Sequence, residues 1–371
     1  MIERERFGQC VLVMQGGGAL GAYQAGVFEA LHEAGVEPDW VIGTSIGAIN
    51  AGIIAGNRHG DRLDRLREFW TRMQYDPFTE ALASIPWWGP AAANANVMNS
   101  GLAGFFSPNP MGALSDWWPT TPENTGIYRT EALGQTLADL IDIEELNAAT
   151  MRLTVGAAHV QSGDMRYFDS RDSALGVKHI LASAALPPGF PAVRVDGELY
   201  WDGGILSNTP VEAVFDDNPR RSGVVFSVHI WSPSGPEPDT LRRVMARAKD
   251  LQYASRSSVH IARQRQLHKL RHIITQLAGH IPEAERQSQA VKALTAYGCV
   301  TTMHVIRLMA PPMAGEDYTK DIDFSAKGIK ARWAAGYADT ARVLEARPWE
   351  AEADPLEGFV LHEAEAGTMV S

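Results

Sequence analysis

The sequence predicts an α/β protein whose central, mostly parallel sheet is covered by helices on both faces. A short apolar run over residues 10–15, ended by three glycines, is typical of a buried strand. Apolar residues at helical spacing follow over 22–34, with Gly35 as a stop signal. Residues 39–42 predict a second strand, and residues 46–55 predict a second helix. Two strand–helix units in succession imply parallel strands joined by crossover helices.

The rest of the chain continues this alternation and then becomes largely helical. Further strands are predicted at 152–159, 164–169, 192–201, 223–231 and 300–308, and further helices at 129–141, 174–184, 237–275, 283–297 and 326–346. We find no internal repeat in the sequence. The last third therefore predicts a mostly helical extension of an α/β core.

Residues 76–125 interrupt the pattern. This segment is rich in Pro, Gly, Ala and Asn, and its aromatic residues include Trp87, Trp88, Phe105, Phe106, Trp117 and Trp118. So long a stretch with little periodicity indicates a functional loop or a partly ordered insertion. Paired tryptophans suit a boundary between apolar and wet surroundings, which favours a lid or an interfacial patch. The competing interpretation is a long loop whose rings pack against the core.

Composition and charge narrow the classes of function. Of the 371 residues, 45% are hydrophobic and 21% are charged, so the chain can bury one large core or two modest ones. The formal net charge of −11 argues against a nucleic-acid binder, because such proteins need a basic footprint. It also discourages global attraction to anionic lipid, and it leaves local peripheral contact with a membrane open.

Cysteine use and the N-terminus predict a cytoplasmic protein. Cys10 and Cys299 are far apart and lie beside apolar runs, which predicts buried free thiols. Residues 1–8 are charged and lack the apolar stretch of a signal peptide. The most apolar run, 41–56, is shorter than the roughly 20 residues that a spanning helix needs. No cluster of His, Cys or carboxylate residues shows metal-ligand spacing, so we expect neither a metal nor a cofactor.

Ser45 is the candidate nucleophile. It lies in the segment GTSIG, a G-x-S-x-G pattern between a predicted strand and a predicted helix. That context is what a nucleophile elbow requires, because a sharp turn lifts the hydroxyl above the sheet. Gly43 and Gly47 relieve the crowding in such a turn. The pattern also occurs by chance, and a serine with a purely structural role in the turn is the competing interpretation.

Gly16, Gly17 and Gly18 lie at the first strand–helix junction and are followed by Gly21. Consecutive glycines expose backbone N–H groups at a helix N-terminus, which can hold an anion. The anion is either a dinucleotide pyrophosphate, since the segment fits G-x-G-x-x-G, or the oxyanion of an acyl-transfer transition state. A dinucleotide site needs an acidic residue at the end of the second strand, which here runs directly into Ser45. The sequence therefore favours an oxyanion hole.

Asp202, followed by Gly203 and Gly204, is the candidate base. A serine hydroxyl is a weak nucleophile until a base accepts its proton. The preceding strand would deliver the aspartate to a strand end, and the two glycines leave room for close approach. An aspartate that merely shapes a turn is the alternative. A histidine base, with His159 or His304 as candidates, would fit an α/β-hydrolase, in which the serine elbow comes only after several strands.

With QGGGALG, GTSIG and DGG in this order, the chain resembles the patatin-like phospholipase family. Segments 182–191 and 208–210 also resemble those that flank the family's aspartate, and the resemblance covers about residues 8–232. It implies a three-layer α/β/α fold and lipid acyl hydrolase activity through a Ser–Asp dyad, which needs no metal. Position by position, Ser45 would be the nucleophile, Asp202 the base, and the glycine loop the oxyanion hole.

Two positions depart from the family's pattern. Many members have Asp before the glycines and Arg two residues past the third glycine, where this chain has Gln15 and Leu20. The missing cation leaves the preferred head group unspecified. The resemblance also divides the chain into a catalytic domain over 1–232, a mostly helical C-terminal extension over 233–350 like that of a bacterial subgroup, and a weakly ordered tail over 351–371.

Together these observations predict a cytoplasmic lipid acyl hydrolase, with contact at the membrane periphery left open. Its expected partner is a lipid or another acyl ester, and nucleic acid is not expected. A carboxylesterase for small or oligomeric hydroxyacid esters is the alternative within enzymes. A non-catalytic lipid-binding protein of the same fold is the alternative outside them, although a pure binder has no need for the serine, the aspartate and the glycine loop together. These motifs do not specify the oligomeric state.

Overall fold

The computed structural model describes residues 4–363, apart from positions 114, 116, 119, 149, 314, 352, 353 and 355–357. Its main sheet is built from β1 (Gln9–Met14), β2 (Trp40–Gly43), β5 (Arg152–His159), β6 (Met165–Asp169), β7 (Val193–Val195), β8 (Glu198–Asp202), β9 (Gly223–His229), β10 (Met303–Met309) and β11 (Phe359–Glu363). The strand order is β11-β10-β9-β1-β2-β5-β8-β7, and β6 pairs with β5. Strands β3 (Ser107–Pro108) and β4 (Tyr128–Arg129) form a separate small sheet.

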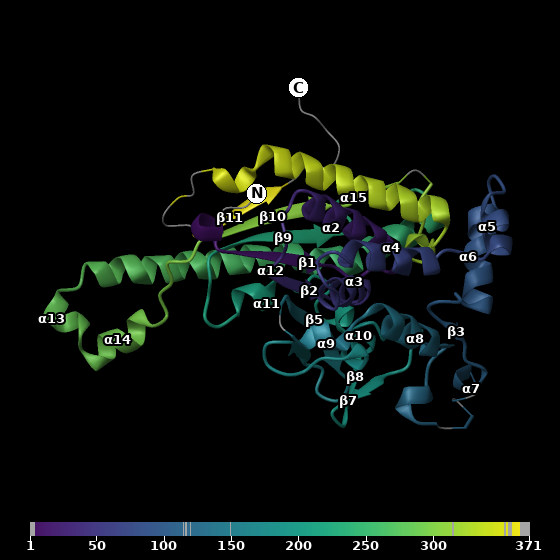
Figure 1. The fold of residues 1–371 in the computed structure, drawn as a ribbon, viewed down its shortest axis with the longest axis horizontal. Coiled ribbons are helices and arrows are strands. Elements are labelled where there is room, and N and C mark those ends of the chain that lie inside the picture. Colours follow the sequence, from purple (N-terminus) through teal and green to yellow (C-terminus); the bar gives the residue numbers. More distant parts are fainter. Residues whose placement is uncertain are drawn as a thin grey trace.

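Helices surround the sheet and extend beyond it at both ends (Figure 1). They are α1 (Arg4–Phe7), α2 (Ala22–Glu33), α3 (Ile46–Ala55), α4 (Arg62–Arg72), α5 (Pro77–Ala83), α6 (Gly89–Ser100), α7 (Pro110–Ala113), α8 (Glu131–Leu140), α9 (Ile143–Asn147), α10 (Val177–Ser183), α11 (Glu212–Phe215), α12 (Leu241–Gly279), α13 (Glu283–Arg286), α14 (Gln289–Thr295) and α15 (Ala326–Ala346). In Figure 1, α13 and α14 lie at the far end of the long α12, whereas α5, α6 and α7 lie at the opposite end of the molecule.

The centre of the sheet is parallel. Strand β1 lies between β2 and β9, and all three run in the same direction. The parallel arrangement continues through β5 beyond β2 and through β10 and β11 beyond β9, whereas β6, β7 and β8 are antiparallel additions. The predicted mostly parallel α/β fold is therefore confirmed. Parallel strands bring their carboxyl ends to one edge, which places the loops after β1 and β2 next to each other.

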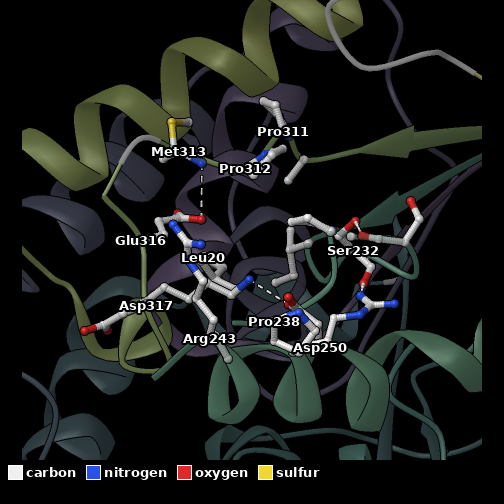
Figure 2. Close-up of a pocket in the computed structure, with 18 of the residues that line it drawn as sticks. Leu20, Ser232, Pro238, Arg243, Asp250, Pro311, Pro312, Met313, Glu316 and Asp317 are labelled. Atoms are coloured by element: carbon white, nitrogen blue, oxygen red, sulfur yellow. Dashed lines mark hydrogen bonds and ion pairs between the residues drawn. The ribbon is translucent and has the colours of Figure 1, made fainter. Parts of the chain in front are cut away.

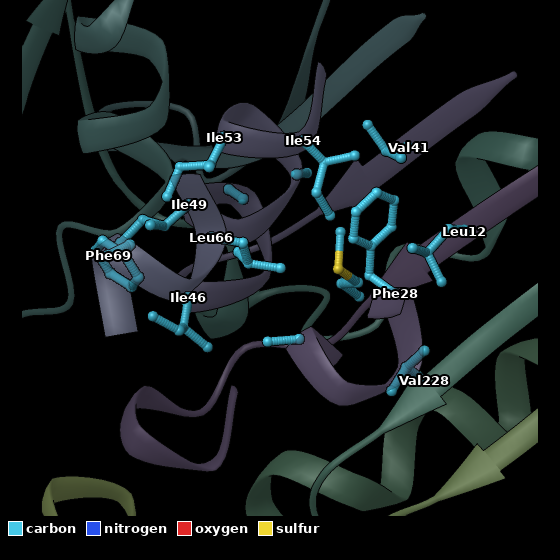
Figure 3. Close-up of a cluster of buried hydrophobic side chains, with 14 of the residues drawn as sticks. Leu12, Phe28, Val41, Ile46, Ile49, Ile53, Ile54, Leu66, Phe69 and Val228 are labelled. Carbon is cyan, nitrogen blue, oxygen red and sulfur yellow. The ribbon is translucent and has the colours of Figure 1, made fainter. Parts of the chain in front are cut away.

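Alternate residues of β1 face two apolar cores. Leu12 and Met14 pack with buried side chains of α2, α3 and α15 in the larger core (Figure 3). Val11 and Val13 pack on the other face with residues of α11 and α12. All four side chains are fully buried, which explains why the strand is apolar at every position instead of at every second one. Helices on both faces of one sheet make the three-layer α/β/α arrangement.

The C-terminal extension shares this sheet and this core. Strand β10 pairs with β9 along its whole length, and Ile306 and Leu308 belong to the larger core. The predicted weakly ordered tail over 351–371 needs a correction, because β11 falls inside it. Phe359 is fully buried, and the strand pairs with β10 in parallel register, so its backbone groups find partners in the sheet. Residues from 364 onward lie outside the described part of the chain.

The insertion predicted over 76–125 folds into helices α5, α6 and α7, strand β3 and the 3-10 turn η2 (Pro122–Asn124). Asp76 caps α5, because its carboxylate accepts hydrogen bonds from the N–H groups of Phe78 and Thr79. The aromatic residues of the insertion divide into two groups. Phe105 and Phe106 are buried, whereas Phe78 and the four tryptophans are exposed.

Helices α2 and α15 cross so closely that the crossing requires glycine on both sides. A Cβ atom at Gly26 would overlap the carbonyl oxygen of Trp333, and one at Gly336 would overlap the carbonyl oxygen of Tyr23. Near this crossing, the Tyr23 hydroxyl donates a hydrogen bond of 2.7 Å to Asp339. The extension is thus attached to the first helix of the catalytic part by backbone contact.

We expect Gly336→Ala to lower the free energy of unfolding by about 1–3 kcal/mol, because the added methyl group forces the two helices apart. Gly134→Ala in α8 is the matched control. A Cβ atom at Gly134 would make only an ordinary 3.6 Å contact with Leu181, so that change should raise stability by about 1 kcal/mol. Equilibrium urea denaturation of both variants measures the difference, and equal losses would contradict the packing argument.

Candidate active site

Ser45 occupies the tight turn between β2 and α3. Its backbone has a φ of 57° and a ψ of −126°, a strained conformation for a residue with a side chain. Two close approaches surround it: a Cβ atom at Gly47 would overlap the carbonyl oxygen of Met14, and one at Gly43 would overlap the backbone of Gly47. The Ser45 N–H donates a 3.1 Å hydrogen bond to the carbonyl oxygen of Ser183. This is the geometry of a nucleophile elbow.

The glycine loop after β1 lies next to Ser45. A Cβ atom at Gly16 would lie 2.9 Å from the Cβ atom of Ser45. The Gly16 N–H donates a 3.1 Å hydrogen bond to the carbonyl oxygen of Asn208, so it is not available as an oxyanion donor. The N–H groups of Gly17 and Gly18 donate to no backbone carbonyl among the described residues, and both glycines line the cavity that contains Ser45. Of the three glycines predicted for the oxyanion hole, Gly17 and Gly18 therefore remain the candidate donors.

Asp202 ends β8 and is almost completely buried. Its Oδ1 atom accepts a 2.7 Å hydrogen bond from the Gly204 N–H, whereas Oδ2 is buried and has no hydrogen-bond partner among the described residues. Burial raises the pKa of the Asp202 carboxyl to about 7, and the Ser45 hydroxyl and the Gly204 N–H offset part of the rise. A carboxylate of this pKa with one unengaged oxygen can accept a proton near neutral pH.

The remaining motif glycines keep neighbouring segments in contact. A Cβ atom at Gly21 would lie 2.5 Å from the Ile46 side chain, which follows Ser45. One at Gly203 would overlap the backbone of β5, and one at Gly204 would lie 2.8 Å from the side-chain oxygen of Asn208. These glycines hold the glycine loop, the serine turn and the aspartate turn together.

Asn208 joins the glycine loop to the aspartate turn, and sequence analysis assigned it no role of its own. Its side-chain N–H donates a 3.0 Å hydrogen bond to the carbonyl oxygen of Gly16, and its own carbonyl accepts the Gly16 N–H. It also lines the Ser45 cavity. In the sequence, Asn208 stood out only as part of segment 208–210, which resembles the segment that follows the family's aspartate and has no assigned function.

A cavity of about 140 Å³ contains both Ser45 and Asp202. Apart from the loops, its walls are mostly apolar and include Phe105, Phe106, Leu186, Phe190, Trp231, Ile322 and Phe324. The rings of Phe105, Phe106 and Phe190 pack against one another with centroids 5.8 to 5.9 Å apart. Part of the predicted insertion therefore forms the wall of this cavity. Walls of this kind suit an acyl chain.

The two candidate histidine bases lie elsewhere. His159 contacts Ser162 and Glu198 at the end of β5, and His304 stacks on His362 between β10 and β11. No histidine is among the described residues that line the Ser45 cavity. Asp202 is therefore the candidate base that the geometry brings to Ser45.

Side chains able to bind a metal gather away from this cavity. Within the described ranges, His32, Glu37 and His59 are close enough to share an ion. None of them lines the Ser45 cavity, and Arg62 already lies 2.7 Å from the Glu37 carboxylate. We therefore assign no metal to the Ser45 site.

The profile described as patatin-like phospholipase matches residues 12–215, which is more than half of the chain. The chain belongs to the patatin-like phospholipase family. A second profile, described as patatin phospholipase, matches residues 251–356, so the C-terminal extension is part of a patatin-type sequence as well.

Individual relatives of this patatin-like chain are distant. Lysophospholipase nte1 of Aspergillus terreus is 26% identical over 259 residues, and lysophospholipase NTE1 of Yarrowia lipolytica is 25% identical over 232 residues. These alignments cover 64% and 62% of this chain but only 14% and 13% of the relatives. The chain thus spans a small part of the length of the curated relatives it matches.

Two solved structures align with this chain at low TM-scores. VipD from Legionella pneumophila aligns over 91% of this chain and 67% of its own, with 16% identity and a TM-score of 0.41. A chain of the complex between SpcU and ExoU from Pseudomonas aeruginosa aligns over 94% of this chain and 75% of its own, with 14% identity and a TM-score of 0.28.

Gln15 stands where many patatin-like proteins have Asp, and its contacts explain the exchange. Its side-chain oxygen accepts hydrogen bonds of 2.6 and 3.0 Å from the N–H groups of Ile230 and Trp231. Its side-chain nitrogen donates a 2.8 Å hydrogen bond to the hydroxyl of Thr209. An ionised carboxylate could only accept, whereas the amide both donates and accepts. Gln15 therefore ties the end of β1 to the segments after β8 and β9.

The extension closes one side of the patatin-like site. Tyr253 of α12 stacks on Trp231 at 5.0 Å, and the Trp231 indole N–H donates a 2.7 Å hydrogen bond to the carbonyl oxygen of Gly16. Asp321, in the 3-10 turn η4 (Lys320–Ile322), lies so close to Gly18 that a Cβ atom there would overlap its carbonyl oxygen. The glycine loop is thus held from the side of the extension.

Two crossed ion pairs join α12 to η4 beside the loop. The ammonium of Lys249 lies 2.6 Å from the Asp321 carboxylate, and that of Lys320 lies 2.6 Å from the Asp250 carboxylate. Both ammonium groups also lie over the Trp231 ring, 6.0 and 5.2 Å from its centroid. The pairs therefore fix the tryptophan that holds the glycine loop.

A second cavity, of about 240 Å³, lies on the other side of these segments (Figure 2). Leu20, Asp250 and Lys320 line it, whereas Gly18 and Asp321 line the Ser45 cavity. Position 20, where the family's cation is missing, thus belongs to the second cavity. The absence of a cation there leaves the walls of the Ser45 cavity unchanged.

We expect Lys320→Met to lower the free energy of unfolding by about 1–3 kcal/mol, because it leaves a largely buried Asp250 carboxylate without its partner. The combined exchange Lys320→Asp with Asp250→Lys should recover part of this loss. Arg243→Met is the control, since its ion pair with Asp239 is exposed and should contribute less than about 0.5 kcal/mol. Denaturant titration of the four proteins checks this, and equal losses for Lys320→Met and Arg243→Met would refute it.

Proposed function

We propose that this chain is a serine lipid acyl hydrolase that cleaves carboxylic ester bonds of phospholipids or related lipids. The supporting observation is that a strained Ser45, an Asp202 with one oxygen unpaired among the described residues, and Gly17 and Gly18 all line one mostly apolar cavity. Membership of the patatin-like phospholipase family and similarity to lysophospholipases agree with lipid esters as substrates.

In this mechanism Asp202 takes the hydroxyl proton of Ser45 as Oγ attacks the ester carbonyl carbon. The N–H groups of Gly17 and Gly18 stabilise the negative oxygen of the tetrahedral intermediate, aided by the positive end of the α3 dipole. Asp202 then returns the proton to the departing alcohol, which leaves an acyl-enzyme. Water, activated by the same carboxylate, releases the fatty acid and restores the Ser45 hydroxyl.

The aromatic walls favour an acyl chain over a small hydroxyacid ester as the bound group. A protein that only binds lipid has no requirement for a serine at positive φ beside a buried carboxyl, and such strain is costly unless it has a use. Among the described helices, none combines the length and the apolar character needed to cross a bilayer.

We expect Ser45→Ala to lose at least about a thousandfold in ester hydrolysis and all labelling by a fluorophosphonate, because both reactions need the hydroxyl. Asp202→Asn should lose about a hundredfold to ten-thousandfold, since the amide cannot accept the proton. Asp164→Asn, in the exposed turn before β6, should keep wild-type turnover. Labelling of Ser45→Ala at this site would remove Ser45 as the nucleophile.

A series of p-nitrophenyl esters of increasing chain length separates the two enzyme classes. The lipid hydrolase predicts that kcat/KM of the wild-type protein rises with chain length, because the longer chain buries more apolar surface against the aromatic walls. A preference for the shortest esters would support the carboxylesterase alternative instead.

The raised pKa of Asp202 predicts how activity depends on pH. The base works only when it is ionised, so kcat/KM should fall about tenfold per pH unit below the pKa of about 7 and level off above it. A short-chain ester in a series of buffers at constant ionic strength measures this. An unchanged rate between pH 5 and pH 8 would contradict Asp202 as the base.

Ionisation of Asp202, which should raise activity, should lower the stability of the folded protein. Because the pKa in the folded state lies above the ordinary value of 3.8, the protonated carboxyl favours folding at low pH, and this contribution is lost as pH rises toward 7. Asp202→Asn should therefore be more stable than the wild-type protein at pH 8, with the difference shrinking as pH falls from 7 to 4. Thermal unfolding at these pH values checks the sign, and a constant difference would count against the raised pKa.

A further inference from the structure

The insertion around α5, α6 and α7 exposes four tryptophans to solvent. Trp87 is 98% exposed, Trp117 76%, Trp118 72% and Trp88 56%, whereas the other six tryptophans of the chain are buried or half-buried. An indole side chain carries 150–250 Å² of surface, much of it apolar, so such exposure is costly in water. Exposed apolar surface of this extent marks an interaction site.

The exposed rings share residues 76–127 with four other large apolar residues that are exposed. We define the tryptophan surface as the exposed residues Phe78, Trp87, Trp88, Met98, Met111, Trp117, Trp118 and Ile127. They lie on α5, α6 and α7 and on the adjoining turns, at one end of the molecule in Figure 1. Trp87 has a φ of 74°, so the turn before α6 holds this ring in solvent at a conformational cost.

The tryptophan surface is continuous in sequence and structure with the wall of the Ser45 cavity. Phe105 and Phe106, which line the cavity, come from the same insertion. Helix α6 is joined to the cavity wall by Tyr128, whose hydroxyl donates a 2.7 Å hydrogen bond to the carbonyl oxygen of Met98 and whose ring packs on Phe106 at 4.6 Å. One folded unit therefore carries both the exposed rings and the inner aromatic wall.

Charge restricts what this surface can bind. Residues 76–127 contain no Lys or Arg, and they contain the acids Asp76, Glu80, Asp116 and Glu123. The whole chain also has a net charge of −11. An anionic bilayer would be repelled, and two copies meeting through this insertion would bring like charges together. A zwitterionic lipid surface carries no such penalty, and indoles favour the interface between lipid and water.

We propose that the tryptophan surface docks this protein on zwitterionic lipid by inserting its indoles, without electrostatic attraction. Docking would bring the Ser45 cavity to the lipid that it hydrolyses, and this role of docking rests on the proposed function. Binding itself needs no catalysis, so the two proposals can fail separately.

The binding test uses the full chain carrying Ser45→Ala, which keeps the vesicles intact. We expect it to float with phosphatidylcholine vesicles, with tryptophan fluorescence shifted to shorter wavelength. Binding should be unchanged or stronger at high salt and weaker when part of the phosphatidylcholine is replaced by phosphatidylserine. Adding Trp87→Ala and Trp88→Ala should weaken binding by roughly tenfold or more, because two large apolar groups no longer leave water.

A matched control removes exposed apolar groups from the other end of the molecule. Leu270→Ala with Leu277→Ala, on α12, alters side chains that are 51% and 61% exposed and should leave vesicle binding unchanged. Equal weakening of vesicle binding in both double variants would indicate non-specific adsorption through exposed apolar groups and would overturn the proposal. So would binding that phosphatidylserine strengthens. A self-associating protein that ignores all vesicles, and becomes monomeric when Trp87 and Trp88 are replaced, would assign the surface to a second copy instead.

Activity with Ser45 intact distinguishes docking from chemistry. Trp87→Ala with Trp88→Ala should lose roughly tenfold in turnover of vesicle phosphatidylcholine and keep wild-type kcat/KM on a soluble p-nitrophenyl ester. Equal losses on both substrates would mean that the rings support the fold, and would overturn docking. If the wild-type protein hydrolyses neither substrate yet floats with vesicles through the tryptophans, docking stands and the hydrolase fails.

Discussion

The arrangement around Ser45 depends on how closely the start of α3 approaches the end of β1. Gly47 touches the Met14 backbone with no room for a side chain, and Gly43 leaves room for Gly47 in turn. This approach sets the serine turn beside the glycine loop and holds Ser45 at positive φ. The strain is tolerated because every residue of α3 is buried, so the helix cannot move away without exposing apolar surface.

A second constraint acts through the buried carboxyl. The Asp202 carboxylate would be better solvated in water, yet within the described part of the chain one of its oxygens has no hydrogen-bond partner. What keeps the aspartate turn in place is a set of hydrogen bonds outside the reacting atoms, from Asn208 to the glycine loop and from Gln15 to the segments after β8 and β9. The site therefore combines a desolvated carboxyl base with surrounding segments that are fixed by hydrogen bonds. Functional sites commonly place a destabilised reactive group on a well-ordered scaffold.

The features that could be predicted from sequence are those whose signal is local. The run in β1 and the serine between a strand and a helix are visible within a few residues. The hairpin of β7 and β8 was also signalled, because Asp196 and Gly197 form its turn at positive φ, yet residues 192–201 were predicted as one strand. By contrast, β11 becomes a strand only by pairing with β10, and Asn208 becomes important only by meeting Gly16. Both contacts join residues far apart in the chain, which no periodicity records.

Contacts between residues far apart in the chain also show that the extension is an integral part of the fold. The family resemblance ended at about residue 232, which suggested a domain boundary, but the contacts of the extension cross that boundary. The extension adds β10 to the central sheet, crosses α2 at Gly336, and presses η4 against Gly18. The residues that hold the glycine loop in place are thus divided between Asn208 of the patatin-like part and Asp321 of the extension. Removing the extension would take Tyr253, Asp321 and Phe324 out of the wall of the Ser45 cavity and leave the glycine loop without its contact at Gly18, so the two parts form one site.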